Sequence, residues 1–390
     1  MTRLRIVVSG LVGLYPLGGV AWDYLQYVIG LARLGHDVYY HEDTWRWPYQ
    51  PVDVTFSADG TYSAAFIAAF LADWAPELAG RWHYVHLATE HHGMSAAAFR
   101  RVAGTADVFL NVSGGSAVPE ELPAGAARVF VDTDPGYNQI MLRQRLAWSD
   151  DSGPWGITSH DRFFTYGENI GGADCRVPAG DFPWRTTRMP VVTALWRDCP
   201  PAPRDAPWST VTTWNAFGHR IVLDGVEYRS KDAEFERLID LPRRVPVPVR
   251  VALGGLGAPG DRLRAYGWQV VDAPAMTISP RSYREFIEGS RGELTPVKEI
   301  YTALRTGWFS TRSACYLAAR RPVVVQQTGL PAGLPVGAGL LVFTCPEEAA
   351  EAVRRVESDY DRHAAAAGRV AEDYFEAGGV LRRLLTDLGA

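Results

Sequence analysis

The stretch "GWFSTRSACYLAARRPVVVQQTG", residues 307–329, contains a helix signal followed directly by a strand signal. Ala314, Leu317 and Ala318 share one helical face, Ser310 stands at the N-cap position, and the Arg-Pro pair at 321–322 ends the helix. The valines that follow form a short continuous apolar run, which is typical of a strand buried on both faces of a parallel sheet. This order of signals predicts an α/β fold.

The same alternation of strand and helix extends to both sides of this stretch. Toward the N-terminus, strands are predicted for the runs "LRIVV" (4–8), "VYY" (38–40), "VFLNV" (108–112) and "RVFVD" (128–132). Around residues 307–329 they are predicted for "VPVRVALGG", "WQVVDA", "RPVVVQQ" and "GLLVF", with helices at about 280–288, 296–305, 310–319 and 346–358. The alternation predicts open parallel sheets with helices on both faces. In addition, Asp224-Gly225 in "RIVLDGVEYRS" predicts a two-residue hairpin turn.

The length of the chain and one change in composition indicate two domains. With 390 residues, the chain is long enough for two domains that each bury a core. Residues 147–208 are rich in Pro, Gly and Trp and interrupt the alternation, so we expect them to connect the domains. The predicted fold class is therefore α/β, with two facing Rossmann-like domains and a cleft between them.

The net charge and the cysteines indicate which kinds of binding partner to exclude and which cellular compartment to expect. A net charge of −5 offers no electrostatic attraction to nucleic acid or to an anionic membrane, so neither is expected as a partner. The four cysteines are scattered without zinc or redox spacing, which suits a reducing cytoplasm. The sequence has no apolar run of about 18 residues, so no membrane span is predicted. The N-terminal stretch carries glycines and a proline and lacks a cleavage motif, which argues against a signal peptide.

The start of the helix at 310 has the residues of an anion site. The hydroxyls of Ser310, Thr311 and Ser313, the Arg312 guanidinium and the backbone N–H groups of a helix start would together suit a pyrophosphate. Arg312 in the first turn opposes the helix dipole, at a cost of about a few tenths of a kcal/mol, and a simple cap would not need it. The alternative is an ordinary cap formed by Ser310 alone.

Two glycine pairs lie where a ligand could approach the backbone. Gly254-Gly255 ends a predicted strand at the carboxyl edge of its sheet, where open α/β sheets bind ligands. Gly18-Gly19 precedes the first helix and would approach a donor from the opposite wall. Each pair could equally be a tight turn. The segment "GLVGLYPLGG" lacks the G-x-G-x-x-G pattern, so NAD binding is disfavoured.

Carboxylates follow two of the predicted strands. Asp132 and Asp134 come directly after the strand at 128–132, and Glu42 with Asp43 follows the second strand. Any of them could act as a general base if it lay within about 3 Å of a substrate hydroxyl. We predict Asp134 as the base, with Asp132 and Glu42 as further candidates and Asp23 ranked below them. The alternative for Asp134 is a helix N-cap, with the proline after it at the first helical position.

Aromatic and histidine side chains are candidates for contact with an acceptor. Trp45 and Trp47 lie in the loop "TWRWPYQP" beside the predicted cleft, where their rings could stack on a sugar or a polyketide-like molecule. The alternative is that they anchor the loop. The run "HLATEHH" lacks the ligand pattern of known zinc sites, so no metal is predicted there and His91 is assigned a substrate contact.

The segment "GSRGELTPVKEIY" adds one acid and one cation to the predicted donor site. Glu293 precedes a predicted helix that carries Lys298. A carboxylate at such a position could accept hydrogen bonds from a ribose, and a lysine could pair with a phosphate. Glu293 and Lys298 alone are weak evidence for a donor site. They support one mainly because they lie close in sequence to the helix start at 310.

Taken together, the residues resemble the GT-B glycosyltransferases, in particular a group of bacterial enzymes that are often actinobacterial. The resemblance covers essentially the whole chain and is carried by "LVGLYPLGGVAWDYLQYVIGLARLGHDVYYHED", "FTYGENIGGADCRVPAGDFPW" and "SRGELTPVKEIYTALRTGWFSTRSACYLAARRPVVVQQTGLP". It implies an acceptor-binding domain at 1–200 with a connector from about 147, a nucleotide-sugar-binding domain at 201–370, and a C-terminal helix at 371–390 that returns to the first domain.

The resemblance implies transfer of a sugar from a nucleoside-diphosphate sugar to a hydroxyl or amine of a small molecule, with natural-product biosynthesis as the expected setting. No metal or cofactor is expected, and the protein is expected to be a monomer or a homodimer. The chain departs from the large retaining group, because it lacks the Glu-x7-Glu pattern, and from the macrolide- and glycopeptide-type enzymes, because it lacks the His-Gly-Gly turn and the histidine base. A sugar-nucleotide 2-epimerase and a non-catalytic nucleotide-sugar-binding protein remain alternatives, and the stereochemistry stays open.

Overall fold

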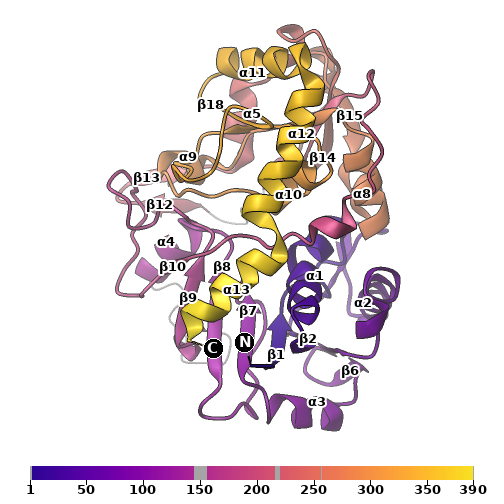
Figure 1. Cartoon of the computed structure of the whole chain (residues 1–390), viewed down its shortest axis with the longest axis vertical. Helices are drawn as coiled ribbons and strands as arrows, with labels where there is room; N and C mark the ends of the chain where they lie inside the picture. The colour runs from indigo at the N-terminus through magenta and orange to yellow at the C-terminus, as the bar shows by residue number, and fades with distance from the viewer. Residues whose placement is uncertain (1, 145–155, 216–219, 256, 390) are drawn as a thin grey trace.

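Two parallel sheets form the framework of the chain (Figure 1). The computed structural model describes residues 2–144, 156–215, 220–255 and 257–389. The first sheet has the strand order β10-β9-β8-β7-β1-β2-β5-β6 and is parallel except for the β5–β6 pair. Its strands are β1 (Arg5–Ser9), β2 (Asp37–Asp43), β5 (Trp82–His86), β6 (Glu90–Gly93), β7 (Val108–Val112), β8 (Ala127–Asp132), β9 (Arg162–Thr165) and β10 (Arg185–Thr186).

The second sheet is parallel throughout and has the order β15-β14-β11-β16-β17-β18. Its strands are β11 (Trp208–Thr213), β14 (Val249–Gly254), β15 (Gln269–Asp272), β16 (Gly292–Thr295), β17 (Val323–Gln326) and β18 (Leu340–Phe343). Two hairpins stand apart from the sheets: β3 (Tyr49–Gln50) pairs with β4 (Thr55–Phe56), and β12 (Ile221–Leu223) pairs with β13 (Val226–Tyr228).

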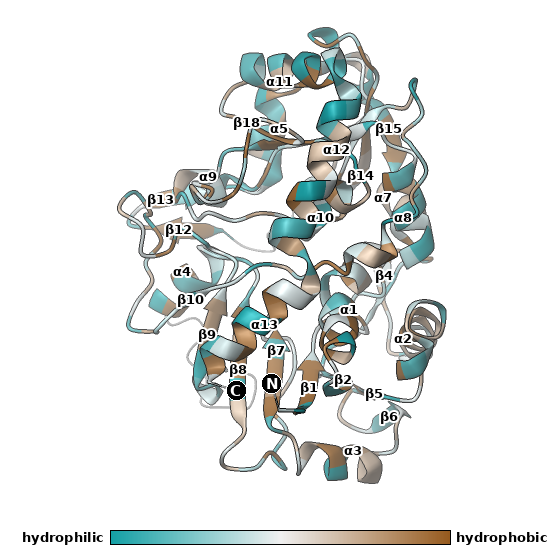
Figure 2. Cartoon of the chain, in the orientation of Figure 1, coloured by the Kyte–Doolittle hydropathy of each residue, from teal (hydrophilic) through white to brown (hydrophobic). Residues whose placement is uncertain are grey.

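Helices cover the sheets and bury their apolar faces against them. Figure 2 shows β1 and β7 in brown among helices that carry more teal. The first sheet has α1 (Gly18–Arg33), α2 (Thr61–Trp74), α3 (Ala96–Ala103) and α4 (Tyr137–Arg143). The second has α5 (Lys231–Arg237), α6 (Gly260–Ala265), α7 (Ala273–Thr277), α8 (Pro280–Glu288), α9 (Glu299–Ala303), α10 (Thr311–Ala318) and α11 (Pro346–Ser358). No helix among the described residues is both long and apolar enough to cross a membrane.

The architecture confirms the predicted fold class. Both sheets are built from parallel strands with helical connections, as in two Rossmann-like domains. The predicted hairpin is confirmed as well, because Asp224 and Gly225 turn with left-handed φ values of 50° and 82° between β12 and β13. The domain boundaries stay predictions, and the expected start of the connector near residue 147 lies outside the described residues.

Several strands lie where the sequence pattern does not predict them, and β9 and β11 are two of these. β9 lies inside the stretch expected to be a connector and extends the first sheet beside β8. β11 lies inside the second sheet, although four of the six residues in its sequence "WSTVTT" carry hydroxyls. The buried hydroxyls of Ser209 and Thr210 are satisfied: Ser209 bonds to the Tyr316 hydroxyl at 2.7 Å, and Thr210 donates to Thr295 Oγ1 at 3.0 Å. Paired polar groups are compatible with a core, which an apolar-run criterion does not detect.

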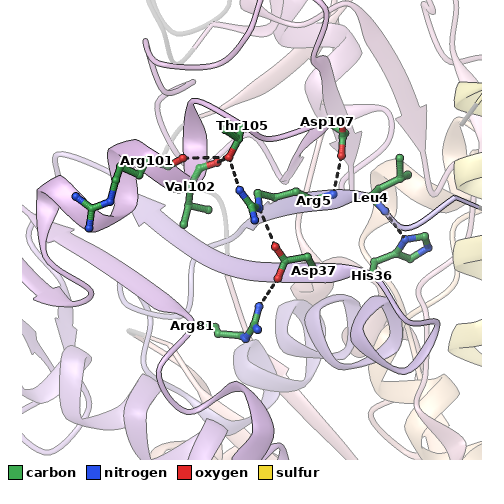
Figure 3. Close-up of polar contacts among 9 residues, drawn as sticks. All are labelled: Leu4, Arg5, His36, Asp37, Arg81, Arg101, Val102, Thr105 and Asp107. Atoms are coloured by element: carbon green, nitrogen blue, oxygen red, sulfur yellow. Dashed lines mark hydrogen bonds and ion pairs between the residues drawn. The ribbon is translucent and has the colours of Figure 1, made fainter.

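At the amino ends of β1 and β2, a group of ion pairs fastens the first sheet (Figure 3). Asp37 accepts a hydrogen bond from Arg5 Nε at 2.8 Å and also pairs with Arg81. Burial alone would raise the pKa of Asp37, but the bonds from both arginines hold it below its ordinary value. The Asp107 carboxylate accepts from the Arg5 N–H at 2.7 Å. These contacts lie at the end of the sheet opposite to the carboxyl ends of its strands.

The last part of the chain crosses from the second sheet back to the first. It runs through α12 (Tyr360–Val370), a π-helical turn (Ala371–Phe375) and α13 (Ala377–Leu388), which Figure 1 shows in yellow beside the first sheet. At the crossing, Val191 N–H donates to Phe375 O at 2.7 Å and Ala377 N–H donates to Val191 O at 2.8 Å. α13 then packs against α1, where a Cβ on Gly30 would lie 2.6 Å from Leu381.

Arg321, just after α10, is expected to contribute strongly to stability. Its side chain is 1% exposed and donates to the carbonyls of Ala319, Pro200 and Glu288 at 2.7–2.9 Å, so it joins the ends of α10 and α8 to the incoming chain. Arg321→Met should lower the free energy of unfolding by about 2 kcal/mol, because it leaves buried carbonyls without a donor. Urea unfolding measures this. The exposed neighbour provides the control, since Arg320→Met should change stability by less than about 0.5 kcal/mol; equal effects would contradict the assignment.

Candidate active site

A cavity of about 110 Å³ lies between the first sheet and the start of α10. Three of its lining residues follow directly on the carboxyl ends of β7, β8 and β9, which is where parallel sheets place their functional loops. The complete lining is Asp23, Tyr24, Val112, Ser113, Thr133, Tyr166, Trp308, Phe309, Ser310 and Thr311. Hydroxyl groups therefore dominate the polar wall, with a single carboxylate among them.

The hydroxyls of this wall form hydrogen-bonded pairs. The Tyr24 and Ser113 hydroxyls are 2.9 Å apart, and Ser113 is 2.6 Å from Thr133 Oγ1. Burial raises the pKa of Tyr24 and of Tyr166 far above the ordinary value, so both phenols stay neutral. On the opposite side, the Trp308 ring stacks on Tyr301 with centroids 4.3 Å apart. Neutral hydroxyls beside an indole ring offer hydrogen bonds and a flat apolar face, which suits a sugar.

Asp23 is the carboxylate of the cavity. It projects from the second turn of α1, and its side chain accepts a hydrogen bond from Thr311 at the start of α10. Burial raises the pKa of Asp23 to about 6, while the Thr311 bond and the charge of Arg312 hold it from rising further. A carboxylate with a pKa near neutrality, inside a cavity, has the properties of a general base. The sequence ranking placed Asp23 below the other acids.

Asp134 follows β8 of the first sheet, and its partners lie in and beside α9, which belongs to the second sheet. Its two carboxylate oxygens accept from Lys298 Nζ and from the Tyr301 hydroxyl, the latter at 2.6 Å. The structure thus brings Asp134 and Lys298 together from positions 164 residues apart. Since the helix that follows begins at Tyr137, with Gly136 as its N-cap, the alternative role of Asp134 as an N-cap is wrong.

Lys298 of this pair forms a group with Lys231 and Arg312, here called the cation group. α5, which Lys231 begins, contacts α9, and the Arg229 N–H just before it donates to Glu299, the residue after Lys298, at 2.7 Å. Lys231 is the first residue of α5 and Lys298 is the N-cap of α9. Burial, followed by the charges of Arg312 and Lys298, lowers the pKa of Lys231 well below its ordinary value. The chain has 2 lysines against 37 arginines, and both lysines stand in this one group.

Arg312 is held by its own domain. It forms an ion pair with Glu293 on β16, and it donates to Val211 O and Thr295 Oγ1, each at 2.8 Å. The side chain of Arg312 is 12% exposed and that of Glu293 is 0% exposed, so this ion pair is buried at the start of α10. Three of the five guanidinium N–H groups already donate within this domain, which disfavours the direct phosphate contact predicted for Arg312. The ribose contact predicted for Glu293 is contradicted, because its carboxylate is 0% exposed on β16.

Ser310, Thr311 and Ser313 occupy different sides of the α10 start. Ser310 caps the helix, with its Oγ accepting from Arg312 N–H at 3.2 Å, and it lines the cavity together with Thr311. Ser313 is fully buried and is not among the residues that line the cavity, and the ligand contact predicted for its hydroxyl stays a prediction. Two of the three predicted hydroxyls therefore lie at the cavity, and the anion site itself stays a prediction.

Two other acids predicted as bases are structural. Asp132 is fully buried and accepts from Gln139, Thr165 and Asn138 at 2.6–2.8 Å, which fixes the loop that carries Asp134. Glu42 is fully buried as well and accepts from the backbone of the first loop, at 2.7 Å from Gly13 and 2.6 Å from Leu14. Neither carboxylate reaches the cavity, so a base role for Asp132 or Glu42 is contradicted.

The two glycine pairs have different surroundings. A Cβ on Gly18 would collide with Ser279 O, and one on Gly19 would lie 3.2 Å from the Tyr283 ring, so this pair allows α1 to pack on α8. The donor contact predicted for Gly18 and Gly19 stays a prediction. Gly254 ends β14, and Gly255 has a φ of 100° with its Cβ position 3.2 Å from Trp214 N, at the carboxyl edge of the second sheet. The nucleotide contact predicted for that pair stays a prediction.

The predicted acceptor residues lie away from the cavity lining. Trp45 and Trp47 are 56% and 55% exposed, in the loop that leads into the β3–β4 hairpin. Tyr49 N–H in β3 donates to Leu14 O at 2.8 Å, which ties this hairpin to the loop before α1. His91 lies on the edge strand β6, with its ring stacked on His83, and does not line the cavity.

Among the residues that the structure describes, no three His, Cys, Asp or Glu side chains are grouped to hold a metal ion.

Several site residues were missed by sequence reasoning, and some left a signal. Ser113 and Thr133 follow buried strands just as Asp134 does, so the strand-end rule applied to every strand would have found them. Lys231 carries a signal in its residue type, because it and the predicted Lys298 are the two lysines of a chain that otherwise uses arginine for its cations. Tyr24, Tyr166 and Trp308 have no comparable signal.

The fold is that of the GT-B class. No family model and no curated protein matches the chain by sequence. Among solved structures, AviGT4, a glycosyltransferase involved in avilamycin A biosynthesis, matches 99% of this chain over 97% of its own length, with a TM-score of 0.54 and 14% identity. An alpha-glucosyltransferase in complex with UDP-glucose and DNA matches over the full length of both chains, with a TM-score of 0.61 and 11% identity.

The Anabaena protein HepE, in complex with UDP and glucose, also matches over the full length of both chains, with a TM-score of 0.51 and 11% identity. At these identities the likeness shows the fold alone. The chain has the GT-B fold of these glycosyltransferases, as the sequence resemblance implies.

Proposed function

We propose that the protein transfers a sugar from a nucleoside-diphosphate sugar to a hydroxyl or amine of a small-molecule acceptor. The observation that carries this proposal is Asp23, a carboxylate with a raised pKa in a hydroxyl-lined cavity, which faces the start of α10. The GT-B fold, found in enzymes bound to UDP and glucose, supports the same reaction. Natural-product biosynthesis remains the proposed setting, and the four free cysteines support the cytoplasm as the location.

In the proposed reaction, the donor diphosphate lies by Lys231, Lys298 and the N-terminus of α10. The lysines and the helix dipole would offset the charge that the diphosphate gains as its bond to the anomeric carbon breaks. Because these groups would neutralise the leaving diphosphate without a metal ion, we propose that the step is metal-independent. Asp134 would position Lys298, since it is bonded to the Lys298 ammonium and to the Tyr301 hydroxyl.

On the acceptor side, Asp23 would take the proton of the attacking hydroxyl while its oxygen forms the new bond to the anomeric carbon. This assignment describes transfer with inversion. The exposed Trp45 and Trp47 remain proposed contacts for an apolar acceptor, because their loop joins the hairpin that is bonded to the loop before α1. The net charge of −5 favours a small molecule over DNA as the acceptor.

The donor half of the proposal is tested with Lys298. Lys298→Ala is expected to weaken the affinity for UDP, dTDP or GDP by about 10–100-fold, because a charge-assisted contact to phosphate is lost. Calorimetric titration measures the affinity, and Arg354→Ala, which removes an exposed cation paired with Glu351, is the control. Release of nucleoside diphosphate from a nucleotide sugar then tests turnover. Isomerisation of the sugar without any acceptor would instead support the epimerase, and binding without turnover would support a binding protein.

A further inference from the structure

Lys231 differs from the other two members of the cation group. Arg312 is paired with Glu293, and Lys298 is paired with Asp134. Among the residues that the structure describes, the half-buried Lys231 ammonium has no hydrogen-bond or ion-pair partner. The group thus contains three cations for two carboxylates.

The charged groups around Lys231 cannot supply the missing partner. On its own helix, Asp232 is bonded to Arg229, and Glu234 accepts from Gln326 Nε2 at 2.5 Å. From the elements packed against it, Arg312 and Lys298 repel a positive charge, and the attraction of Glu293 and Asp134 is the smaller effect. A half-buried ammonium without a partner is costly, and a lysine avoids that cost by giving up its proton.

The presence of lysine instead of arginine at position 231 also indicates that this side chain can lose its proton. The chain uses arginine at 37 positions and lysine at 2, both of them in this group. Arginine stays charged in proteins, whereas lysine can be neutral in one state and charged in another. A lysine at position 231 is therefore the cation that can lose its charge while the site is empty.

We propose that Lys231 is neutral in the empty site and takes up a proton from solvent when a diphosphate binds beside it. This inference rests on the proposed function, because the donor diphosphate is the anion that would favour the charged amine. Binding and protonation are then linked, so donor affinity falls as the pH rises. The cost of an unpaired cation is avoided between turnovers, and the full positive charge is present when the leaving group departs.

The number of protons taken up can be measured directly. UDP-glucose, dTDP-glucose and GDP-mannose are titrated by calorimetry at about pH 8, where ordinary carboxylates and histidines no longer titrate. The tightest of the three is then titrated in buffers with different ionisation enthalpies. Wild type is expected to take up close to one proton for each nucleotide sugar bound. Lys231→Arg should bind with almost no uptake, and Lys231→Ala should bind at least about tenfold more weakly, also without uptake.

The controls separate this inference from the proposed function. Asp23→Asn removes the carboxylate of the cavity, which is the alternative group that could gain a proton. The uptake should persist in this variant if Lys231 is the group that gains it. Binding by wild type without uptake, or equal uptake in wild type and Lys231→Arg, would overturn the role of Lys231 and leave the donor site intact. If none of the three nucleotide sugars binds, the proposed function itself fails, and the inference fails with it.

Discussion

Asp23→Asn is expected to lower the rate of sugar transfer by about 10²–10⁴-fold, which is the contribution of a positioned general base. The amide has nearly the same volume as the carboxylate and can still accept the hydrogen bond from Thr311, but it cannot take a proton from the acceptor. Donor affinity should stay within about threefold of wild type, because Asp23 is not part of the cation group. The rate is measured as nucleoside diphosphate released, and the affinity by calorimetry.

The pH profile provides a second measurement of the same residue. Burial raises the pKa of Asp23 to about 6, and only the deprotonated form can act as a base. The rate should therefore rise with pH through about 6 and become level within about one unit above that value. Asp23→Asn should lose this acidic limb together with most of its activity.

Asp134→Asn separates the two candidate bases. Because Asp134 contacts Lys298 and Tyr301, its loss should raise the KM for the donor more than it lowers kcat. If the large loss of kcat occurred in Asp134→Asn and not in Asp23→Asn, the base predicted from the sequence would be correct and the assignment to Asp23 would be wrong. A small effect of both changes would favour a retaining mechanism.

The fold was accessible from the sequence because apolar runs and helix stops alternate along most of the chain. The valine run of β17 and the Asp224-Gly225 turn are local signals, and local signals survive without knowledge of tertiary contacts. β11 is different, since Ser209 and Thr210 are acceptable in a core only when Tyr316 and Thr295 lie opposite them. That information depends on how distant segments pair.

The site was predictable in its location and much less in its roles. The rule that parallel strands end at one edge led to Asp134, and the helix-start signal led to Ser310 and Thr311, and the structure brings all three to the cleft. The partner of Arg312 depends on the register of β16 beside α10, which no short pattern encodes. The raised pKa of Asp23 could not be predicted from the sequence, because it comes from burial between two halves of the chain.

Arg312→Met is expected to lower the free energy of unfolding by about 3–5 kcal/mol, the usual cost of breaking a buried ion pair from one side. Glu293 is fully buried on β16, so removal of the guanidinium leaves its charge without a counterion in the core. Two further bonds, to Val211 O and Thr295 Oγ1, are lost as well. Denaturant unfolding measures the loss of stability. Arg354→Met, which breaks the exposed ion pair with Glu351, is the control, and a larger loss in this control than in Arg312→Met would contradict the prediction.

The double variant Arg312→Met/Glu293→Met decides whether Arg312 acts through the fold or through the ligand. With both charges removed, no ion is buried alone, so the protein should be at least about 1 kcal/mol more stable than Arg312→Met. UDP affinity in the double variant should then lie within about threefold of wild type, because the guanidinium donates to Glu293, Val211 and Thr295 and not to phosphate. A recovered stability with a UDP affinity weakened by more than about tenfold would show that Arg312 leaves Glu293 to bind the diphosphate, as the helix-start pattern predicts.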